Sequence, residues 1–331
     1  MKLKDKISIG CSIVKAKLLK ESIPLFVAWS LTNRCNLSCK YCNRQDINST
    51  ELETAEIFLI IEQLKNSGTK IISFTGGEPL LRADIGEIIN YTCKCGIYVN
   101  INTNGTLFSQ KINALNNITS VKFSLDGPKK VNDYIRGKDS FQKVVEAIKI
   151  AKRRRIAVSI VTVLSKYNLD SVDYLINLAE NLGIGILFQP PTLTLLGTDV
   201  VNPHIPDVSG YRDVVDKLIV YRKRSETVLN SIKGLTYLRG WPDGRDIFCY
   251  NKNISCRIET DGYLYHCGRM QDKTAALNCL RVGPSKAFDA LKDVSCNNCW
   301  CALRLENNFI ASLDLRVIFS ILKNSKWRDR I

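Results

Sequence analysis

The chain has 331 residues, of which 45% are hydrophobic and 24% charged, and its formal net charge is +15. This composition is typical of a globular protein that buries a sizeable core. The chain has thirteen cysteines and no apolar run of signal-peptide or membrane-span length, which favours metal binding in a reducing compartment, the cytoplasm, over disulfides. It has only two histidines, His204 and His266, so a histidine-based metal site is disfavoured.

The first segment, residues 1–23, predicts a basic amphipathic helix. Lysines occupy positions 2, 4, 6, 15, 17 and 20, and apolar residues recur at helical spacing: Leu3, Ile7, Cys11, Val14 and Leu18. Such a helix either packs on the rest of the fold or lies on a membrane interface. We favour packing, and peripheral membrane contact through residues 1–20 stays open.

Residues 24–190 alternate short apolar runs with amphipathic helical patterns. The apolar runs predict six strands, at 26–31, 70–74, 97–101, 121–125, 157–164 and 184–188. Helical patterns fall between them, at 53–65, 84–93, 109–116, 141–152 and from about 172 to 179. Apolar strands separated by helices predict a parallel sheet covered by helices, with ligands at the carboxyl ends of the strands. The pattern alone fits both an open sheet and a closed barrel.

The alternation stops beyond residue 190. Residues 191–245 predict a connector or an insertion that covers the substrate. The last segment, 246–331, contains seven cysteines within 53 residues, with neither helical nor strand spacing. Within it, residues 256–267 predict two short strands around an Asp-Gly turn. A second metal site explains these cysteines better than buried packing does, whereas we expect Cys11, Cys93, Cys95 and Cys279 to pack as small hydrophobic residues.

The motif most informative about chemistry directly follows the first predicted strand. Cys35, Cys39 and Cys42 have the spacing Cys-x3-Cys-x2-Cys. Three soft thiolates on a short loop suit an iron–sulfur cluster, and three ligands for four irons leave one iron open to another molecule. A zinc site would want a fourth ligand nearby, and a disulfide would leave an odd thiol, so both alternatives are less favoured.

Polar or glycine-rich turns follow the next three strands as well. They are Thr75-Gly76-Gly77-Glu78-Pro79, Asn102-Thr103-Asn104-Gly105 and Ser124-Leu125-Asp126-Gly127-Pro128. Two glycines allow the backbone to approach a ligand, and the short polar side chains suit hydrogen bonds to one. Each turn also has an ordinary interpretation, because Asn-Gly and Asp-Gly form turns wherever they occur.

The cysteine spacing, with Tyr41 before the last cysteine, resembles the signature of the radical S-adenosylmethionine (radical SAM) enzymes. The resemblance implies a partial (β/α)6 barrel over residues 24–190 and a four-iron cluster on the three cysteines. The open iron would then chelate S-adenosylmethionine. It further implies cofactor contacts from several residues: Tyr41, Gly76, Gly77, Glu78, Asn104, Ser124, Asp126 and Arg136. Arg136 would lie near the methionine carboxylate, with a surface arginine as the alternative.

The region beyond residue 246 resembles the auxiliary-cluster domains of the same superfamily, called SPASM with two extra clusters and twitch with one. The resemblance implies one further four-iron cluster, because few cysteines follow the last Cys-x2-Cys pair. Its candidate ligands are Cys249, Cys256, Cys267, Cys296 and Cys299, and Cys301 is doubtful. A four-cysteine zinc site is the main alternative.

The family's chemistry would be reductive cleavage of S-adenosylmethionine to a 5′-deoxyadenosyl radical, which abstracts hydrogen from an unactivated carbon. It implies a flavodoxin- or ferredoxin-type reductant and a natural-product, peptide or lipid/isoprenoid precursor as substrate. One alternative is a nucleic-acid-modifying radical SAM enzyme, suggested by the charge and by basic runs at 152–155 and 222–224. No nucleic-acid motif accompanies these runs, so solvated helix faces are favoured. Another alternative is a non-catalytic iron–sulfur protein.

Overall fold

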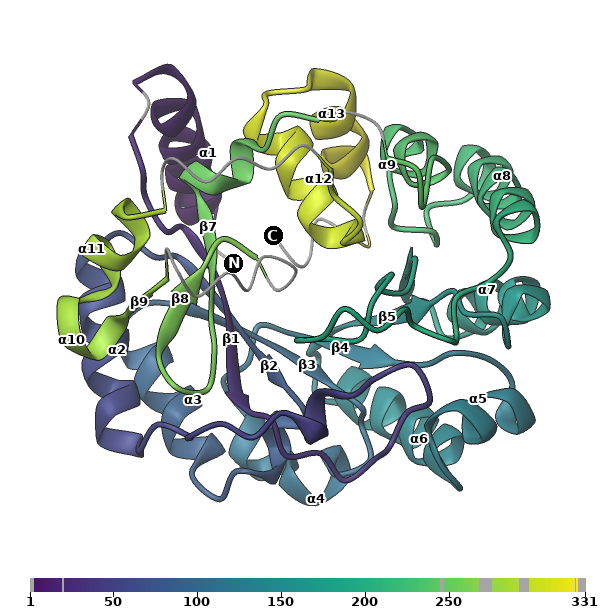
Figure 1. The fold of residues 1–331 in the computed structure, drawn as a ribbon, viewed down its shortest axis with the longest axis horizontal. Coiled ribbons are helices and arrows are strands. Elements are labelled where there is room, and N and C mark those ends of the chain that lie inside the picture. The colour runs from purple at the N-terminus through teal and green to yellow at the C-terminus, as the bar shows by residue number, and fades with distance from the viewer. Residues whose placement is uncertain are drawn as a thin grey trace.

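The computed structural model describes residues 3–19, 21–244, 247–267, 276–291, 298–324 and 326. Its framework is one curved β-sheet (Figure 1). In the described part of the chain the sheet has nine strands, in the order β6-β5-β4-β3-β2-β1-β7-β8-β9. The strands are β1 (Phe26–Thr32), β2 (Ile71–Gly76), β3 (Tyr98–Thr103), β4 (Ser120–Ser124), β5 (Ala157–Val163), β6 (Gly185–Gln189), β7 (Ser255–Ile258), β8 (Tyr263–Tyr265) and β9 (Leu277–Asn278).

Helices cover the outer side of this sheet and continue beyond its last parallel strand (Figure 1). They are α1 (Leu3–Leu18), α2 (Thr54–Asn66), α3 (Ile85–Lys94), α4 (Phe108–Lys111), α5 (Lys129–Arg136), α6 (Ser140–Arg153), α7 (Val172–Asn181), α8 (Val208–Arg224), α9 (Ile232–Leu238), α10 (Cys279–Val282), α11 (Pro284–Asp289), α12 (Ala302–Ala311) and α13 (Leu315–Lys323). Within the described ranges, none of these helices is long and apolar enough to cross a membrane.

Strands β1 to β6 run parallel, each paired with the next along the chain. This confirms the predicted α/β class with a six-stranded, partial barrel. The strands bury their outward residues against the helices: Trp29 and Phe74, for example, are at most 1% exposed and pack with ring centroids 6.3 Å apart. The resulting core runs along the whole sheet.

The inner face of the sheet is polar on its middle strands, which the apolar strand patterns did not indicate. Ser73, Asn100 and Ser120 stand side by side on β2, β3 and β4. The Ser120 hydroxyl donates to Asn100 Oδ1 at 2.8 Å. These side chains line a cavity rather than a packed centre. The strands therefore separate an apolar outer layer from a polar interior that can receive a ligand.

The cysteine-rich C-terminal region extends the same sheet. Strand β7 pairs in parallel with β1, with Val27 opposite Cys256, and β8 returns antiparallel to β7. The predicted hairpin around Asp261 and Gly262 is therefore present. Its attachment to β1 was not predicted, because a strand pattern does not indicate which edge the strand will join. This attachment brings the two cysteine-rich parts of the chain onto neighbouring strands.

Helix α1 packs at the end of the sheet where the parallel strands begin. Its buried residues Ile9, Ile13 and Ala16 form a small core with residues that precede or open β1, β2 and β7, and with the end of α12: Leu25, Ile71, Ile254 and Ala311. The opposite end, where the parallel strands finish, carries the first cysteine loop. The fold thus leaves the carboxyl ends of the strands free to build a site.

Candidate functional site

The first cysteine group lies on the loop that follows β1. Cys35 and Cys39 are half-buried and Cys42 is exposed. The backbone N–H of Cys42 donates to the carbonyl of Cys39 at 2.9 Å, which closes a tight turn between them. The N–H of Lys40 donates to the carbonyl of Ile135 at 3.0 Å and ties the loop to α5. The structure therefore brings the three predicted ligands onto one anchored loop.

The electrostatics show that these thiols influence one another. Burial raises the pKa of Cys39 to about 11, Arg136 opposes this rise, and Cys42 and Cys35 add to it. Burial is also the main cause that raises the pKa of Cys35, with smaller increases from Glu78 and Cys42. Without a bound cation the Cys39 thiol therefore stays protonated at neutral pH. A metal would reverse this, because a coordinated thiol loses its proton.

The donor set fits an iron–sulfur cluster better than a single ion. No group of three or more His, Cys, Asp or Glu side chains in the described ranges is arranged to hold one metal ion. A four-iron cluster takes one thiolate for each iron, so its ligands stand apart by the width of the cluster. Two sulfurs also have nitrogen donors 3.8 Å away, Asn104 Nδ2 at Cys35 and Arg136 Nη1 at Cys39. Hydrogen bonds to the sulfurs are typical of such clusters.

The Gly76-Gly77 turn packs closely against the start of the cysteine loop, and Gly76 also lines the cavity. A Cβ on Gly77 would lie 2.3 Å from the carbonyl oxygen of Arg34, and one on Gly76 would lie 2.2 Å from that of Thr32. The N–H of Gly77 donates to the Thr32 carbonyl at 2.7 Å, and the N–H of Glu78 donates to the Arg34 carbonyl at 2.9 Å. This close approach of two protein backbones requires glycine for steric reasons, and the predicted contact of the turn with a ligand stays a prediction.

Glu78 connects this turn to the next strand end. Its buried carboxylate accepts three hydrogen bonds, from Thr103 Oγ1 at 2.8 Å, from the N–H of Asn104 at 2.7 Å and from the N–H of Leu80 at 3.0 Å. Burial raises the pKa of Glu78 to about 7, although these bonds oppose the rise. The carboxylate is thus occupied by the protein itself and fixes the position of Asn104.

Asn104 reaches the cysteine loop from the end of β3. Its Nδ2 donates to Asn36 Oδ1 at 2.9 Å and points at the Cys35 sulfur, and its Oδ1 accepts from the N–H of Thr106 at 2.9 Å. On the cavity wall nearby, Asn102 Oδ1 is buried and has no hydrogen-bond partner in the described part of the chain. Ser124 ends β4 and is half-buried.

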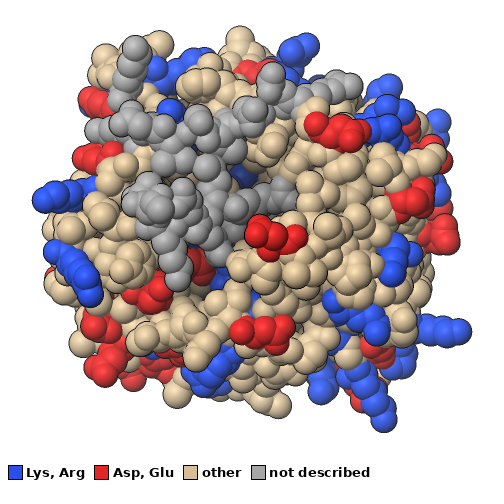
Figure 2. Space-filling model, in the orientation of Figure 1, with Lys and Arg blue, Asp and Glu red and all other residues tan. Residues whose placement is uncertain are grey.

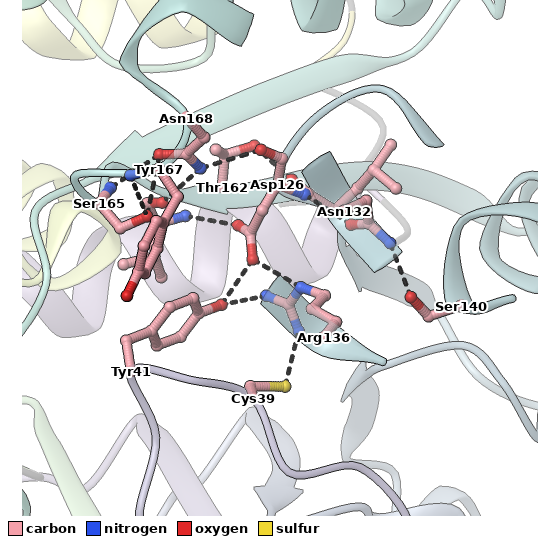
Figure 3. A network of polar contacts seen from close by, with 12 residues as sticks. Cys39, Tyr41, Asp126, Asn132, Arg136, Ser140, Thr162, Ser165, Tyr167 and Asn168 are labelled. Atoms are coloured by element: carbon pink, nitrogen blue, oxygen red, sulfur yellow. Dashed lines mark hydrogen bonds and ion pairs between the residues drawn. The ribbon is translucent and has the colours of Figure 1, made fainter. Parts of the chain in front are cut away.

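A buried network joins the cysteine loop to the ends of β4 and β5 (Figure 3). Arg136 Nε donates to Asp126 Oδ2 at 2.6 Å, and the Tyr41 hydroxyl donates to the same oxygen at 2.7 Å. The other Asp126 oxygen accepts from the N–H of Val163 at 3.1 Å. Arg136 also contacts the Tyr41 oxygen and points its Nη1 at Cys39. Three predicted site residues, Tyr41, Asp126 and Arg136, thus contact one another, and Arg136 reaches the Cys39 sulfur.

Two amides that the sequence analysis did not single out orient this network. Asn132 Oδ1 accepts from the N–H of Asp126 at 2.9 Å, and Asn168 Nδ2 donates to the Asp126 carbonyl at 2.9 Å (Figure 3). Asn132 lies on α5, a helix that was not predicted because it is short and mostly polar. The helix ends at Arg136, which places this side chain against Asp126, just after the end of β4.

A second buried charge cluster was also missed. The Glu259 carboxylate accepts from Arg44 Nη1 at 3.0 Å and from Arg257 Nε, and Arg257 contacts the Ser30 hydroxyl. Although burial opposes it, the two guanidinium groups lower the pKa of Glu259 to about 2. Arg44 follows the cysteine loop, Arg257 lies on β7 and Glu259 comes directly after β7, 215 positions from Arg44. Only the pairing of β7 with β1 brings them together.

The second cysteine group gathers residues from three segments. Burial raises the pKa of Cys299, and the nearby thiols of Cys301, Cys249 and Cys267 raise it further. Cys249 precedes a short helical turn at 250–253, Cys267 follows β8, and Cys301 caps the start of α12. Amino ends of helices favour thiolates, and Arg304 in the first turn of α12 opposes the rise at Cys299. These four side chains therefore lie near one another on the wall of one cavity.

The other candidate cysteines have different positions. Cys256 is fully buried on β7, and burial raises its pKa to about 12. Its thiol raises the pKa of Cys279, which is also buried, so the two lie near each other in the core. Cys296 lies outside the described residues. Cys301, which the sequence analysis doubted, is thus placed with Cys299, whereas Cys256 has a core neighbour.

One cavity of about 1200 Å³ reaches both cysteine groups. Its lining includes Cys42 of the first group and, from the C-terminal region, Cys249, Cys256, Cys267, Cys299 and Cys301. The polar inner face of the sheet forms part of its wall, and residues 190–199 border it as well. A cavity of this size accommodates a small molecule together with part of a larger one. The expected covering role of the segment after residue 190 remains a prediction.

Comparisons with known proteins bear on this site. Residues 29–179 match the family model described as "Radical SAM superfamily". The AdoMet-dependent heme synthase of Oleidesulfovibrio alaskensis is 29% identical over 227 residues, which cover 64% of this chain and 57% of that protein. Mycofactocin maturase MftC of Mycolicibacterium smegmatis is 29% identical over 271 residues, which cover 78% of this chain and 68% of that protein.

Among solved structures, Streptococcus suis SuiB bound to S-adenosylmethionine has a TM-score of 0.66 and 17% sequence identity, covering 85% of this chain and 70% of SuiB. This likeness shows a shared fold. The chain spans 57% of the length of the heme synthase, so the similarity leaves much of that relative unmatched.

Proposed function

The chain belongs to the radical SAM superfamily through its residues 29–179, and on this premise we propose that it is an enzyme with a four-iron cluster on its first cysteine group. Cys35, Cys39 and Cys42 would be the three ligands, and the fourth iron would bind S-adenosylmethionine. When bound, the cluster and S-adenosylmethionine would supply reductive cleavage of the sulfonium and hydrogen abstraction from an unactivated carbon by the 5′-deoxyadenosyl radical.

The observation that carries this proposal is the cavity that reaches both cysteine groups. Its lining includes Cys42 together with Cys249, Cys256, Cys267, Cys299 and Cys301. A substrate in this cavity would lie next to the first cluster and would be enclosed by the sheet, which limits contact of a reactive species with water.

The surrounding residues would position the cluster and S-adenosylmethionine. Asn104 and Arg136 would donate hydrogen bonds to the ligand sulfurs of Cys35 and Cys39. Gly76, Gly77 and Glu78 would act by holding the cysteine loop and Asn104, and Asp126 with Tyr41 would act by orienting Arg136. Ser124 would offer a hydroxyl toward the ribose or methionine groups.

We further propose that Cys249, Cys267, Cys299 and Cys301 hold an auxiliary four-iron cluster. The mutual influence of these thiols and the amino end of α12 support this set. It includes Cys301 in place of Cys256, whose neighbour is Cys279. Cys296 stays a candidate from its sequence position, and zinc stays the alternative metal. A fully ligated auxiliary cluster would transfer an electron, whereas an open iron would bind substrate.

The substrate that we propose is a natural-product, peptide or lipid/isoprenoid precursor. The names of the two relatives point to different molecules, heme for one and mycofactocin for the other. A reductant of the flavodoxin or ferredoxin type would deliver the electron in a reducing compartment, the cytoplasm.

The nucleic-acid alternative has less support. The basic run 152–155 lies exposed at the carboxyl end of α6, where positive charges stabilise the helix through its dipole. Figure 2 shows Lys and Arg side chains spread among Asp and Glu over the face that it draws. Binding to RNA or DNA that weakens steeply with salt would favour this alternative.

The experiment that tests the proposal is anaerobic reconstitution with iron and sulfide, followed by dithionite and S-adenosylmethionine. We expect the wild-type chain to form 5′-deoxyadenosine. A Cys35→Ala/Cys39→Ala/Cys42→Ala variant should form none. A wild-type chain that binds iron but leaves S-adenosylmethionine intact would instead support the non-catalytic iron–sulfur protein.

A further inference from the structure

Exposed apolar side chains concentrate on two helices, α1 and α13. In the described part of the chain, fifteen large hydrophobic side chains are exposed, and seven of these lie on α1, directly after it, or on α13. They are Ile7, Val14, Leu18, Leu19, Leu315, Phe319 and Leu322, and four of them are more than 60% exposed. The two helices contribute few of the chain's residues, so this concentration needs an explanation.

Each helix is apolar on two sides. On α1, Ile9, Ile13 and Ala16 are buried, while Ile7, Val14 and Leu18 form an exposed stripe at spacings of seven and four residues. On α13, Val317 and Ile321 are buried, while Leu315, Phe319 and Leu322 are exposed at spacings of four and three. The buried sides hold the helices to the protein. The exposed stripes are not needed for that packing.

The end of α1 contacts the turn that joins α12 to α13. Lys17 Nζ donates to the carbonyl of Ser312, just before α13, and also stands 5.1 Å from the centre of the Tyr250 ring. The Tyr250 ring packs against Phe248, which is 61% exposed, with ring centroids 4.8 Å apart. Figure 1 shows α1 and α13 along the same edge of the molecule. We call the exposed residues of α1, Phe248 and α13 together the α1/α13 face.

Positive charge accompanies the apolar stripes of the α1/α13 face. Lys4, Lys15, Arg316 and Lys323 are exposed on the two helices. The carboxylates there already have partners: Asp5 accepts from the Tyr98 hydroxyl at 2.6 Å, and Asp314 pairs with Lys233. The face is therefore apolar and cationic. Two copies of it would bring like charges together, which disfavours self-association.

We propose that the α1/α13 face binds the anionic surface of a lipid bilayer. Its apolar side chains would enter the boundary between headgroups and acyl chains, and its lysines and arginine would contact lipid phosphates or carboxylates. The face is built around α1, which packs where the parallel strands begin. The cysteine loop follows the other end of β1, so bilayer binding would leave it accessible.

The test is sedimentation of the purified chain with vesicles of phosphatidylcholine containing phosphatidylserine, and with vesicles of phosphatidylcholine alone. We expect binding to the anionic vesicles only, and weaker binding at high salt. Leu315→Ser/Phe319→Ser should remove most of this binding. Lys15→Gln/Lys323→Gln should weaken it by roughly tenfold or more, because each lysine near an anionic surface contributes substantially to attraction.

Matched controls change the same residue types elsewhere. Leu59→Ser/Val220→Ser alters two other exposed apolar residues, and Lys143→Gln/Lys149→Gln alters two exposed lysines of α6. Both controls should bind vesicles like the wild-type chain, and circular dichroism should show every variant folded. Absence of vesicle binding, or equal losses in the controls, would overturn the proposal. So would a dimer that only the α13 variant dissociates. The assay needs no cluster, so its outcome is independent of S-adenosylmethionine cleavage.

Discussion

The Arg136 guanidinium places its Nη1 3.8 Å from the sulfur of Cys39 while its Nε lies 2.6 Å from Asp126. A buried cation is thus fixed beside a proposed cluster ligand by a carboxylate on the opposite side. Asp126 in turn is held by the Tyr41 hydroxyl and by the N–H of Val163. The arrangement sets both the charge and the direction of a hydrogen-bond donor at Cys39.

The first prediction concerns this pair. Arg136→Met should lower the free energy of unfolding by about 3–5 kcal/mol, because it leaves the Asp126 carboxylate buried without its cation. Adding Asp126→Asn should recover much of the loss, since the uncharged amide still accepts from Val163. Urea denaturation of the cluster-free chain measures both. An Arg136→Met variant as stable as the wild type would contradict the buried ion pair.

The second prediction concerns Gly77. Gly77→Ala should destabilise the chain by roughly 1–3 kcal/mol, because its Cβ would overlap the carbonyl oxygens of Arg34 and Asn33. The displaced loop should also bind less iron at the first site. Gly10→Ala is the matched control, since nothing lies within 4 Å of its Cβ. Thermal unfolding and iron analysis of both variants check this; equal behaviour would show that the two backbones do not touch.

The third prediction assigns the auxiliary ligands. A Cys35→Ala/Cys39→Ala/Cys42→Ala variant should retain about four irons after reconstitution, the content of one four-iron cluster. Adding Cys299→Ala or Cys301→Ala should remove them. Adding Cys279→Ala should not, because Cys279 is buried near Cys256 in the core. Iron that survives loss of both Cys299 and Cys301 would place the second site elsewhere.

The fourth prediction is a pH dependence from Glu306. Burial raises the pKa of Glu306 from 4.5 to about 7, so the folded chain holds this proton more tightly than the unfolded chain does. Protonated Glu306 therefore contributes at most about 3 kcal/mol to the free energy of unfolding. This contribution is fully present below pH 4.5 and is lost as pH rises through about 7.

Glu306→Gln removes this titration while keeping an acceptor for the N–H of Ser231, which lies 2.8 Å from Glu306 Oε1. The stability of the wild type relative to this variant should therefore fall between pH 4.5 and pH 8. Urea denaturation across that range measures the difference. A difference that stays constant with pH would show that Glu306 has an ordinary pKa.

Much of the parallel sheet was predictable because its strands are short, apolar and separated by one-sided helices. The cysteine spacing likewise indicated the first site, since its ligands are close in sequence. The partners of Glu78 and the pairing of Arg44 with Glu259 were not predictable, because they depend on which strand ends meet. The same holds for the grouping of Cys299 and Cys301 with Cys249 and Cys267, which depends on where the start of α12 lies in the fold.

Formation of 5′-deoxyadenosine tests the central claim most directly. Wild type, Cys39→Ala and Cys279→Ala should be reconstituted together and incubated anaerobically with dithionite and S-adenosylmethionine. We predict 5′-deoxyadenosine from the wild type and from Cys279→Ala, whose cysteine is a core residue, and none from Cys39→Ala. Product from Cys39→Ala, or no product from an iron-loaded wild type, would contradict the assignment of the first cysteine group.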